Sequence, residues 1–504
     1  MHRSCARIVF SIVLAMLAVT ALAPAQAATG DPEAVLKAWL DVLNRADEAG
    51  VVEEFIRARF APRLADAIPM DEHVSRFGEM HREYGRLELH SIREKTDDRI
   101  QALLHNDRNR WFLATLFIEA ESGLVRGLGF DDGADPPEVL DAPRAADLEA
   151  WVKAIRGYAD RRAEQDLFSG TVIVRLDGAE ACRGAWGLAS MRYGVPNQVD
   201  TKFNLGSMNK MFTAVAVAQL AEQGKLAYTD LVGRHLPDYP NAAVREKVTI
   251  HHLLSHTSGM GNHFTDEFIR GAKDQYRHFT AYIPLFADEP LAFDPGERFS
   301  YSNAGFFVLG LIIEAASGES YYDYIRKHIY VPAGMANSDC YDVDLSVPNL
   351  ATGYTRERFD EPSVDDHAPW MEALGPWREN TLMHSVKGGP AGGGYSTVED
   401  LTRFAMALTD GTLVSSETLA LLTSAKSDLV TEPDGGVHSY GYGFGVGAHG
   451  DGTPYFGHTG GFPGINAVLR IYPTRRGSIA VMSNQDDGAL EVRAFAARTM
   501  PASK

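Results

Sequence analysis

The pattern of apolar residues predicts a small domain of helices and strands near the start of the chain. Apolar side chains recur at helical spacing over residues 32–64. Residues 87–130 alternate as short strands, and 100–104 and 111–118 are spaced like the two arms of a hairpin. We therefore expect a small α+β domain, of unknown role, over residues 28–130.

A second, longer segment starts with an amphipathic helix and two strands. The helix is expected over residues 145–164 and the strands over 168–176 and 181–187. In the following stretch, 211–220, only a threonine and a glutamine are polar. Such a composition is typical of a helix that is buried nearly all round.

The rest of this segment is mainly helical and then returns to strands. Helices are expected at 250–255, 303–316, 321–328, 398–408 and 416–425. Strands are expected at 442–448, 455–458, 465–472 and 478–484, before a last helix at 490–498. If the late strands join the early ones, the result is an α+β fold: an antiparallel sheet flanked by helices, with a helical lobe.

An acidic, proline-containing run without periodicity separates the two segments. It covers residues 131–147 and begins Asp-Asp-Gly-Ala-Asp-Pro-Pro, a composition typical of a linker. The second domain is then expected to span residues 148–500.

The first residues have the features of a secretory signal peptide. Arg3 and Arg7 give a basic start, residues 8–22 are apolar, and Ala-Gln-Ala at 25–27 forms a small-residue cleavage site. We expect residues 1–27 to be removed and the protein to be periplasmic or secreted. An uncleaved anchor is the alternative, although the apolar run is short for a membrane span. No later segment is long and apolar enough to cross a bilayer.

Composition and charge narrow the expected partners. The formal net charge is −19, which argues against nucleic acid or an anionic membrane surface as a partner. Beyond the leader only Cys182 and Cys340 remain, and an oxidising compartment permits one disulfide between them.

Ser207 and Lys210 stand three residues apart at the start of the apolar helix. On a helix this spacing places a hydroxyl and an amine on one face, one turn apart, where the amine can take the hydroxyl proton. A serine at the start of a helix can also simply cap it. The pair alone leaves both interpretations open.

Two further segments carry polar residues that complete a pattern. Tyr301 and Asn303 lie in the run Pro-Gly-Glu-Arg-Phe-Ser-Tyr-Ser-Asn. His458, Thr459 and Gly460 lie in the run Gly-His-Thr-Gly-Gly. A glycine-rich strand of this kind allows a substrate backbone to approach closely.

Together with Leu-Leu-Ser-His-Thr-Ser-Gly over 253–259 and Gly-Gly-Gly-Tyr-Ser-Thr over 392–397, these motifs strongly resemble the serine β-lactamase and penicillin-binding-protein superfamily. The closer likeness is to the branch that holds class C β-lactamases, DD-carboxypeptidases, D-aminopeptidases and β-lactamase-like esterases. The resemblance covers roughly residues 150–490 of the chain. The resemblance implies a β-lactamase/transpeptidase-like fold and acyl transfer through an acyl-enzyme.

The resemblance also implies roles for the motif residues. Ser207 is the expected nucleophile, and its backbone N–H together with that of Gly461 is expected to bind the oxyanion. Lys210 and Tyr301 are expected to transfer protons, and the sequence does not decide which of them is the base. Asn303 is the expected partner of the lysine and of a substrate amide.

The histidine motif is the main departure from the family pattern. His458 stands where many members have a lysine that meets a substrate carboxylate, and Thr459 and Gly460 continue the expected substrate-binding strand. A histidine carries only a fractional charge near neutral pH. We therefore rank D-amino-acid or peptide amides and carboxylic esters above β-lactams, and keep β-lactamase as an alternative.

Other hydrolase classes are disfavoured. No Gly-x-Ser-x-Gly elbow of an α/β-hydrolase occurs. His252 and His256 are four residues apart but lack the acidic partner of a zinc motif, so neither a metal nor a cofactor is expected. The expected partner is a small-molecule or peptide substrate, with cell-wall peptide as one option. A non-catalytic sensor that is acylated without turnover is the other alternative.

Overall fold

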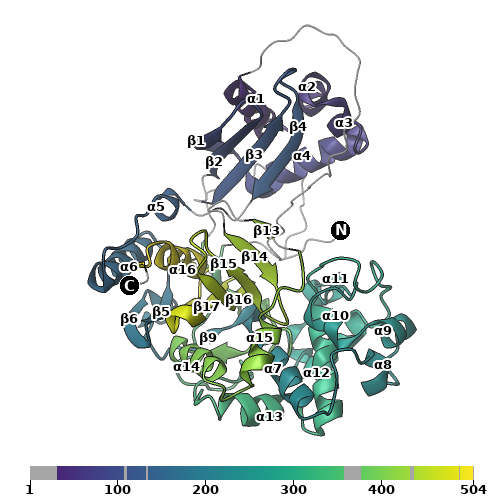
Figure 1. Cartoon of the computed structure of the whole chain (residues 1–504), viewed down its shortest axis with the longest axis vertical. Helices are drawn as coiled ribbons and strands as arrows, with labels where there is room; N and C mark the ends of the chain where they lie inside the picture. The colour runs from purple at the N-terminus through teal and green to yellow at the C-terminus, as the bar shows by residue number, and fades with distance from the viewer. Residues whose placement is uncertain are drawn as a thin grey trace. The chain divides into compact units, whose positions relative to one another are not determined.

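The computed structural model describes residues 31–106, 110–131, 134, 136–356, 376–428, 430–431, 436–486 and 488–502. The chain divides into two compact units, one reaching Leu140 and a second that begins at Asp141 (Figure 1). The leader predicted for residues 1–27 lies outside the described residues and stays a prediction. Among the described residues, no helix combines the length and the hydropathy that a membrane span requires.

In the first unit, four helices pack against one face of a four-stranded antiparallel sheet (Figure 1). The helices are α1 (Pro32–Asn44), α2 (Val51–Arg59), α3 (Pro62–Ala65) and α4 (Met70–Tyr84). The strands lie in the order β1 (Leu87–Lys95), β2 (Arg99–Asn106), β3 (Trp111–Ile118) and β4 (Val125–Asp131). Trp39 of α1 is fully buried in the core between the two layers. The predicted hairpin is present, since Ile100 pairs with Leu116 and Leu104 with Phe112.

The second unit is built on an eight-stranded antiparallel sheet with the order β13-β14-β15-β16-β17-β18-β5-β6. In chain order its strands are β5 (Gly170–Leu176), β6 (Ala179–Trp186), β13 (Val430–Thr431), β14 (Val437–Tyr440), β15 (Gly445–Ala448), β16 (Pro454–Phe462), β17 (Ile465–Tyr472) and β18 (Gly477–Ser483). The last strand pairs with the first strand of this unit, with Ala480 opposite Ile173. The late strands therefore join the early ones, as predicted.

Short two-stranded pairs and helices complete the second unit. The short strands are β7 (Leu188–Ser190), β8 (Val195–Pro196), β9 (Phe203–Asn204), β10 (Tyr354–Thr355), β11 (Arg378–Glu379) and β12 (Tyr395–Ser396). The α-helices of this unit are α6 (Leu148–Glu164), α7 (Asn209–Glu222), α8 (Val232–His235), α9 (Ala242–Lys247), α10 (Ile250–Leu254), α11 (Asp266–Arg270), α12 (Asn303–Ser317), α13 (Tyr321–Ile325), α14 (Val398–Thr409), α15 (Ser416–Leu422) and α16 (Gly488–Arg498). The short helix α5 (Pro137–Leu140) precedes them and belongs to the end of the first unit.

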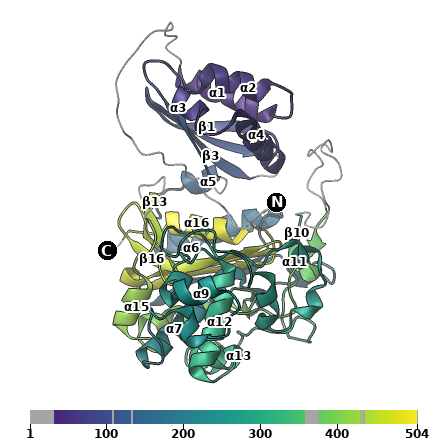
Figure 2. The ribbon, with the colours of Figure 1, turned by 90° about the vertical axis from the view of Figure 1, so that its right-hand side faces the viewer.

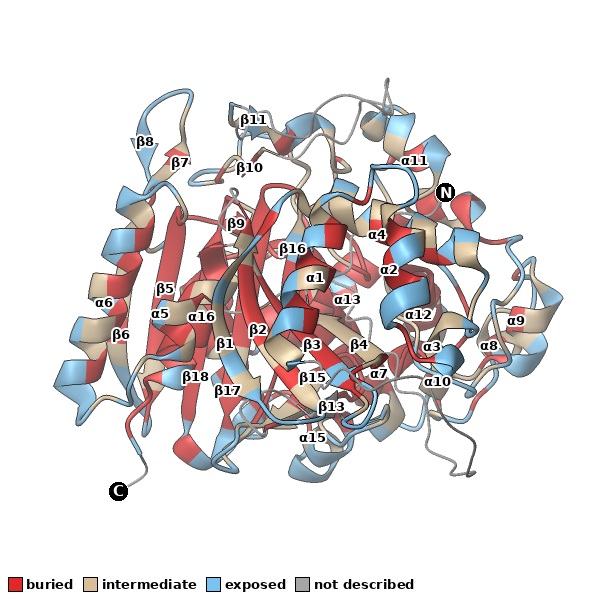
Figure 3. Cartoon of the chain, turned by 90° about the horizontal axis from the view of Figure 1, so that it is seen from above, coloured by how far each residue is buried: buried red, intermediate tan, exposed pale blue. Residues whose placement is uncertain are grey.

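Helices cover both faces of the large sheet. α6 and α16 lie on one face, and α7, α12 and α13 lie on the other (Figure 2). On the first face Trp151 donates a hydrogen bond to the Ala496 carbonyl over 2.9 Å, and the Tyr158 and Phe495 rings stack with centroids 4.2 Å apart. When the residues are coloured by burial, strands β5 and β18 are buried, whereas the outer side of α6 is exposed (Figure 3). The predicted fold class, an antiparallel sheet flanked by helices, is confirmed.

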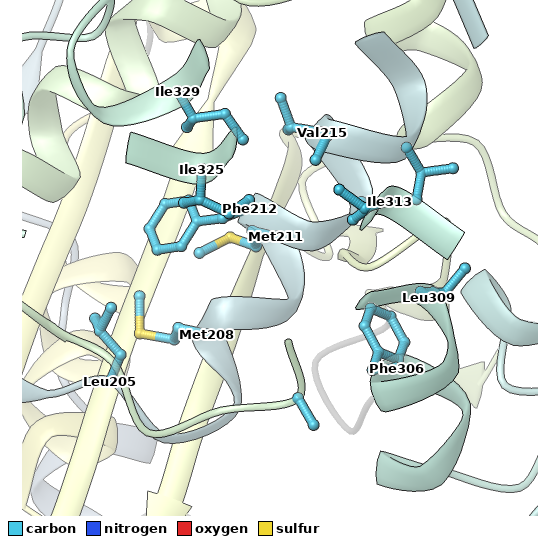
Figure 4. Close-up of a cluster of buried hydrophobic side chains, with 14 of the residues drawn as sticks. Leu205, Met208, Met211, Phe212, Val215, Phe306, Leu309, Ile313, Ile325 and Ile329 are labelled. Carbon is cyan, nitrogen blue, oxygen red and sulfur yellow. The ribbon is translucent and has the colours of Figure 1, made fainter. Parts of the chain in front are cut away.

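Helix α7 passes through the core of the helical lobe. Met211, Phe212 and Val215 are fully buried, and they point into a cluster formed with side chains of α12 and α13 (Figure 4). This explains the nearly uninterrupted apolar sequence of α7, since it has no face toward solvent over most of its length. A helix buried in this way holds the residues at its start in fixed positions.

Several predicted elements differ from the structure. Of the strand expected at 442–448, only residues 445–448 form a strand, β15; β14 was not predicted, and β16 is longer than the predicted 455–458. The helix expected at 321–328 is α13 followed by one wider π turn, η4 (Arg326–Tyr330). Helix α4 was not predicted, because it is strongly polar and buries little beyond Phe77. The predicted linker, 131–147, contains the one-turn helix α5.

The disulfide considered between Cys182 and Cys340 is absent. Both cysteines are buried free thiols. Cys182 lies on β6 opposite Val174, whereas Cys340 lies beside the start of α7, where the Asn209 amide is 3.6 Å from its sulfur. The two side chains therefore belong to different parts of the core.

Candidate active site

Ser207 lies on a single 3₁₀ turn, η1 (Gly206–Met208), directly before α7. Hydrogen bonds hold this turn: the Gly206 N–H donates to the Asn204 side chain over 2.9 Å, and the Leu205 N–H donates to the Gly394 carbonyl over 2.7 Å. Gly206 has a φ of +49°, a region that favours glycine. The turn therefore presents a half-buried serine at a fixed place.

The Lys210 amine is fully buried one turn further along and has three neighbours. Its Nζ lies 2.6 Å from Asn303 Oδ1, 2.6 Å from the Ala391 carbonyl oxygen and 3.2 Å from Ser207 Oγ. Both oxygens at 2.6 Å can only accept, so two N–H bonds of the amine are directed at them. The third position of the amine faces the Ser207 hydroxyl.

Burial lowers the pKa of Lys210 well below its ordinary value of 10.5. A neutral amine has two N–H donors and one lone pair. Because Asn303 and Ala391 use the two donors, the lone pair faces Ser207 Oγ. The geometry thus suits Lys210 to accept the proton of the Ser207 hydroxyl.

Tyr301 is the second candidate for proton transfer. Burial raises the pKa of its phenol above the ordinary value of 10, and a hydrogen bond with the Ser207 side chain opposes this shift less strongly. Lys210 Nζ lies 4.7 Å from the centre of the Tyr301 ring. The phenol is therefore protonated at neutral pH and next to the serine, where it can donate and relay a proton.

Asn303 is the first residue of α12 and connects the lysine to a neighbouring loop. Its Oδ1 accepts from Lys210, and its Nδ2 donates to Asn262 Oδ1 over 2.6 Å. Ser302 caps the helix, because its Oγ accepts from the Gly305 N–H over 3.0 Å. The cap and the Asn262 contact fix the direction of the Asn303 amide.

The end of β16 packs directly against the serine turn. A side chain at Gly460 could not be accommodated, since an ideal Cβ there would lie 1.8 Å from the Leu205 carbonyl oxygen and 3.1 Å from the Ser207 nitrogen. A Cβ at Gly206 would lie 2.9 Å from the Gly461 nitrogen. The glycines therefore bring the backbone nitrogens of Ser207 and Gly461 close together, as two oxyanion donors require.

His458 lies on β16 and has protein partners at both ring nitrogens. Its Nδ1 is 2.5 Å from the Thr459 carbonyl oxygen, which can only accept, so Nδ1 carries the proton and Nε2 accepts from the Tyr440 hydroxyl over 2.9 Å. Burial lowers the pKa of His458 to about 3. At neutral pH this position holds an uncharged imidazole. The Thr459 side chain is exposed.

The structure therefore brings Ser207, Lys210, Tyr301 and Asn303 together, with His458 at a ring distance of 6.5 Å from Tyr301. Sequence reasoning missed the Ala391 carbonyl. The glycine-rich run that directly follows it, residues 392–397, packs against the serine turn, because the Gly393 N–H donates to the Gly206 carbonyl over 3.1 Å. That packing was signalled only by the run of small residues.

Asn262 and Tyr440 were also missed as parts of the site. Each lies far along the chain from the residue that it contacts, so no local spacing marks it. Within the described ranges, no group of three or more His, Cys, Asp or Glu side chains is placed to hold a metal.

Buried histidines make the stability of the fold depend on pH. Burial lowers the pKa of His458 and His263 to about 3 and that of His438 to about 4, from 6.5. Below pH 6.5 the unfolded chain binds these protons first, so the free energy of unfolding falls as pH falls toward 4, by about 1.4 kcal/mol per pH unit for each group. We expect Tm to decrease in this window, and to decrease less steeply in His263→Phe. Identical slopes in thermal melts of the two proteins would contradict this.

Comparison with known proteins agrees with this geometry. Residues 151–499 match the family model described as Beta-lactamase. Penicillin-binding protein 4* of Bacillus subtilis (strain 168) is 31% identical over 342 residues, which cover 66% of this chain and 72% of that protein. Esterase EstB of Burkholderia gladioli is 35% identical over 226 residues, 42% of this chain and 55% of that protein.

A solved structure shows the same fold. The crystal structure of a penicillin-binding protein from Bacillus halodurans matches with a TM-score of 0.58 and 31% identity, covering 67% of this chain and 97% of that chain. The chain belongs to the beta-lactamase family, within the serine β-lactamase and penicillin-binding-protein-like superfamily of serine hydrolases.

Proposed function

We propose that the protein is a periplasmic or secreted serine hydrolase that cleaves ester or amide bonds through an acyl-enzyme on Ser207. The observation that carries this proposal is the Lys210 amine, whose two N–H groups point at carbonyl oxygens while its third position faces Ser207 Oγ. A serine that only caps a helix does not need a buried amine beside its hydroxyl. An amine in this position can instead take the hydroxyl proton and so activate the serine as a nucleophile.

The reaction follows from the positions of the groups. Lys210 takes the hydroxyl proton as Ser207 Oγ bonds to the substrate carbonyl carbon, and the negative oxygen is held by the N–H groups of Ser207 and Gly461. The bond to the leaving group then breaks, and Tyr301 relays the proton from the lysine to the departing alcohol or amine. Water then attacks the carbonyl carbon of the ester on Ser207 and loses a proton, Ser207 Oγ leaves and takes up a proton, and the carboxylic acid is released from the restored enzyme.

The state of His458 supports uncharged substrates. A carboxylate next to the reactive carbonyl is best bound by a fixed cation, and an imidazole with a pKa of about 3 does not supply one. We therefore place neutral esters and amides above β-lactams and above peptides that end in a free carboxylate. The similarity to an esterase over part of the chain points the same way.

A turnover panel tests the proposal. Wild type and Ser207→Ala are assayed with p-nitrophenyl esters, D-amino-acid amides, a D-Ala-D-Ala peptide and nitrocefin. We expect ester or amide hydrolysis that disappears in the variant. Fastest hydrolysis of nitrocefin would instead support a β-lactamase. Labelling of Ser207 without product release would support a sensor, and neither labelling nor turnover would end the hydrolase proposal.

An aromatic pair beside the site predicts a preference for apolar acyl groups. The rings of Phe264 and Phe462 stack with centroids 5.9 Å apart, and both are half-buried. Phe462 directly follows Gly461, and Phe264 lies two residues after Asn262, the partner of Asn303. We expect Phe264→Ala to lower kcat/KM for p-nitrophenyl phenylacetate about tenfold while changing that for the acetate less than about threefold.

The control for this selectivity is an exposed aromatic residue elsewhere on the second unit. Tyr193, between β7 and β8, is 76% exposed, and Tyr193→Ala should leave the ratio of the two kcat/KM values unchanged. An equal loss on both esters in Phe264→Ala would contradict a role in acyl selectivity.

A further inference from the structure

His256 combines two unfavourable features in one buried residue. Its φ is +58°, which is uncommon for a residue with a side chain. The side chain is fully buried, and among the described residues its Nε2 has no hydrogen-bond partner. A strained backbone conformation and an unsatisfied buried polar atom both cost free energy, and they persist only where the surrounding structure imposes them. Such features are common at functional sites.

The contacts of His256 bracket Tyr301 from both sides along the chain. The His256 carbonyl accepts from the Ser300 N–H over 2.8 Å, and its ring Nδ1 accepts from the Ser302 N–H over 3.0 Å. Between these two anchors the His256 ring lies 4.2 Å from the Tyr301 ring, at an interplanar angle of 36°. One residue thus holds the backbone before and after Tyr301 and also contacts its ring.

The far side of His256 is closed by other rings of the same site. Tyr440, which donates to His458, lies 4.7 Å from the His256 ring. Phe306, which lies below Lys210 Nζ at 5.4 Å, is 5.1 Å from it. The imidazole has little room to move, and any displacement of it passes to the Tyr301 ring.

We infer that His256 is a positioning residue that fixes the Tyr301 phenol against Ser207 and Lys210. This inference rests on the proposed function, because it concerns how the proton-transfer group of that reaction is held. A shift of about 1 Å in a reacting group can reduce a rate about 10²-fold. Burial keeps the pKa of His256 well below 6.5, so the ring stays neutral and Nδ1 stays an acceptor.

A double-mutant cycle tests the inference. His256→Phe keeps a ring but removes the Nδ1 acceptor, and His256→Asn keeps an acceptor and tolerates a positive φ. Each is made in wild type and in Tyr301→Phe and assayed with an activated p-nitrophenyl ester. We expect His256→Phe to lower kcat about 10- to 100-fold with KM within about threefold. In Tyr301→Phe the same change should cost less than about threefold, and His256→Asn should keep part of the activity.

A matched control separates positioning from general destabilisation. His263 is another buried histidine of the same loop, and its Nδ1 has no hydrogen-bond partner among the described residues. Its ring contacts a different set of rings, those of Phe264, Phe268, Tyr282 and Phe307. His263→Phe should change kcat by the same small factor in both backgrounds. Near-UV circular dichroism checks that each variant is folded. If His256→Phe does not fold, the double-mutant cycle is measured with His256→Asn instead.

The outcomes distinguish the inference from the proposed function. Equal factors for His256→Phe with and without Tyr301 would overturn the positioning role, as would an unchanged kcat, while Ser207-dependent turnover left the proposed function intact. Absence of turnover in wild type would instead remove the proposed function itself, and with it the inference.

Discussion

Replacing Ser207 by alanine is expected to lower kcat for the best ester or amide substrate by about 10⁴- to 10⁶-fold, because the change removes the atom that forms the acyl bond. The variant should keep the fold, since Ser207 is only half-buried and the turn around it is held by backbone bonds of Leu205 and Gly206. The measurement is steady-state kcat with a p-nitrophenyl ester. Tm should change by no more than a few degrees.

The control is a serine of similar burial outside the site. Ser190 on β7 is half-buried, and Ser190→Ala should retain full activity. Comparable activity in Ser207→Ala and wild type would contradict the assignment of the nucleophile, whatever the substrate turns out to be.

Replacing Lys210 by methionine is expected to lower the acylation rate by about 10²- to 10⁴-fold, the usual contribution of a general base. Methionine fills a similar space without an amine. Lys210→Arg is the informative partner, because a guanidinium stays charged at any accessible pH and offers no lone pair. If Lys210 acts as the base, both variants lose activity alike, and activity retained in the arginine variant would show that only a positive charge is needed. Stopped-flow release of p-nitrophenol measures the acylation step.

The pH dependence of wild type follows from the same two pKa shifts. The active form has a neutral Lys210, so kcat/KM falls as pH drops through its pKa, which burial places well below 10.5. Tyr301 acts as a protonated phenol, and burial raises its pKa, so no loss is expected below pH 10. A plateau that begins only near pH 10.5 would contradict a neutral lysine in the resting enzyme.

The sequence pattern predicted the parts of the site that lie on strongly periodic elements. Helix α7 was recognisable because nearly every residue in it is apolar, and that placed Ser207 and Lys210 at the start of a core helix. The family resemblance added Tyr301, Asn303 and the β16 motif. The structure shows the first two in contact with Lys210 or Ser207.

The remaining parts of the site depend on contacts that no local pattern records. The Ala391 carbonyl reaches Lys210 across 181 residues, and the Tyr440 hydroxyl meets His458 through the β14–β15–β16 sheet. His458 was expected to carry a fractional charge because exposed imidazole does so. Its burial, visible only in the fold, makes it neutral at pH 7.

The measurement that tests the central claim most directly is peptide mapping of the acylated protein. Wild type is mixed with a p-nitrophenyl ester, quenched in acid within the first turnover, digested and analysed by mass spectrometry. We predict one acyl group on the peptide that contains Ser207, and none on the same peptide from Ser207→Ala. An acyl group on another residue, or steady turnover with no acylated Ser207 at any quench time, would contradict the account.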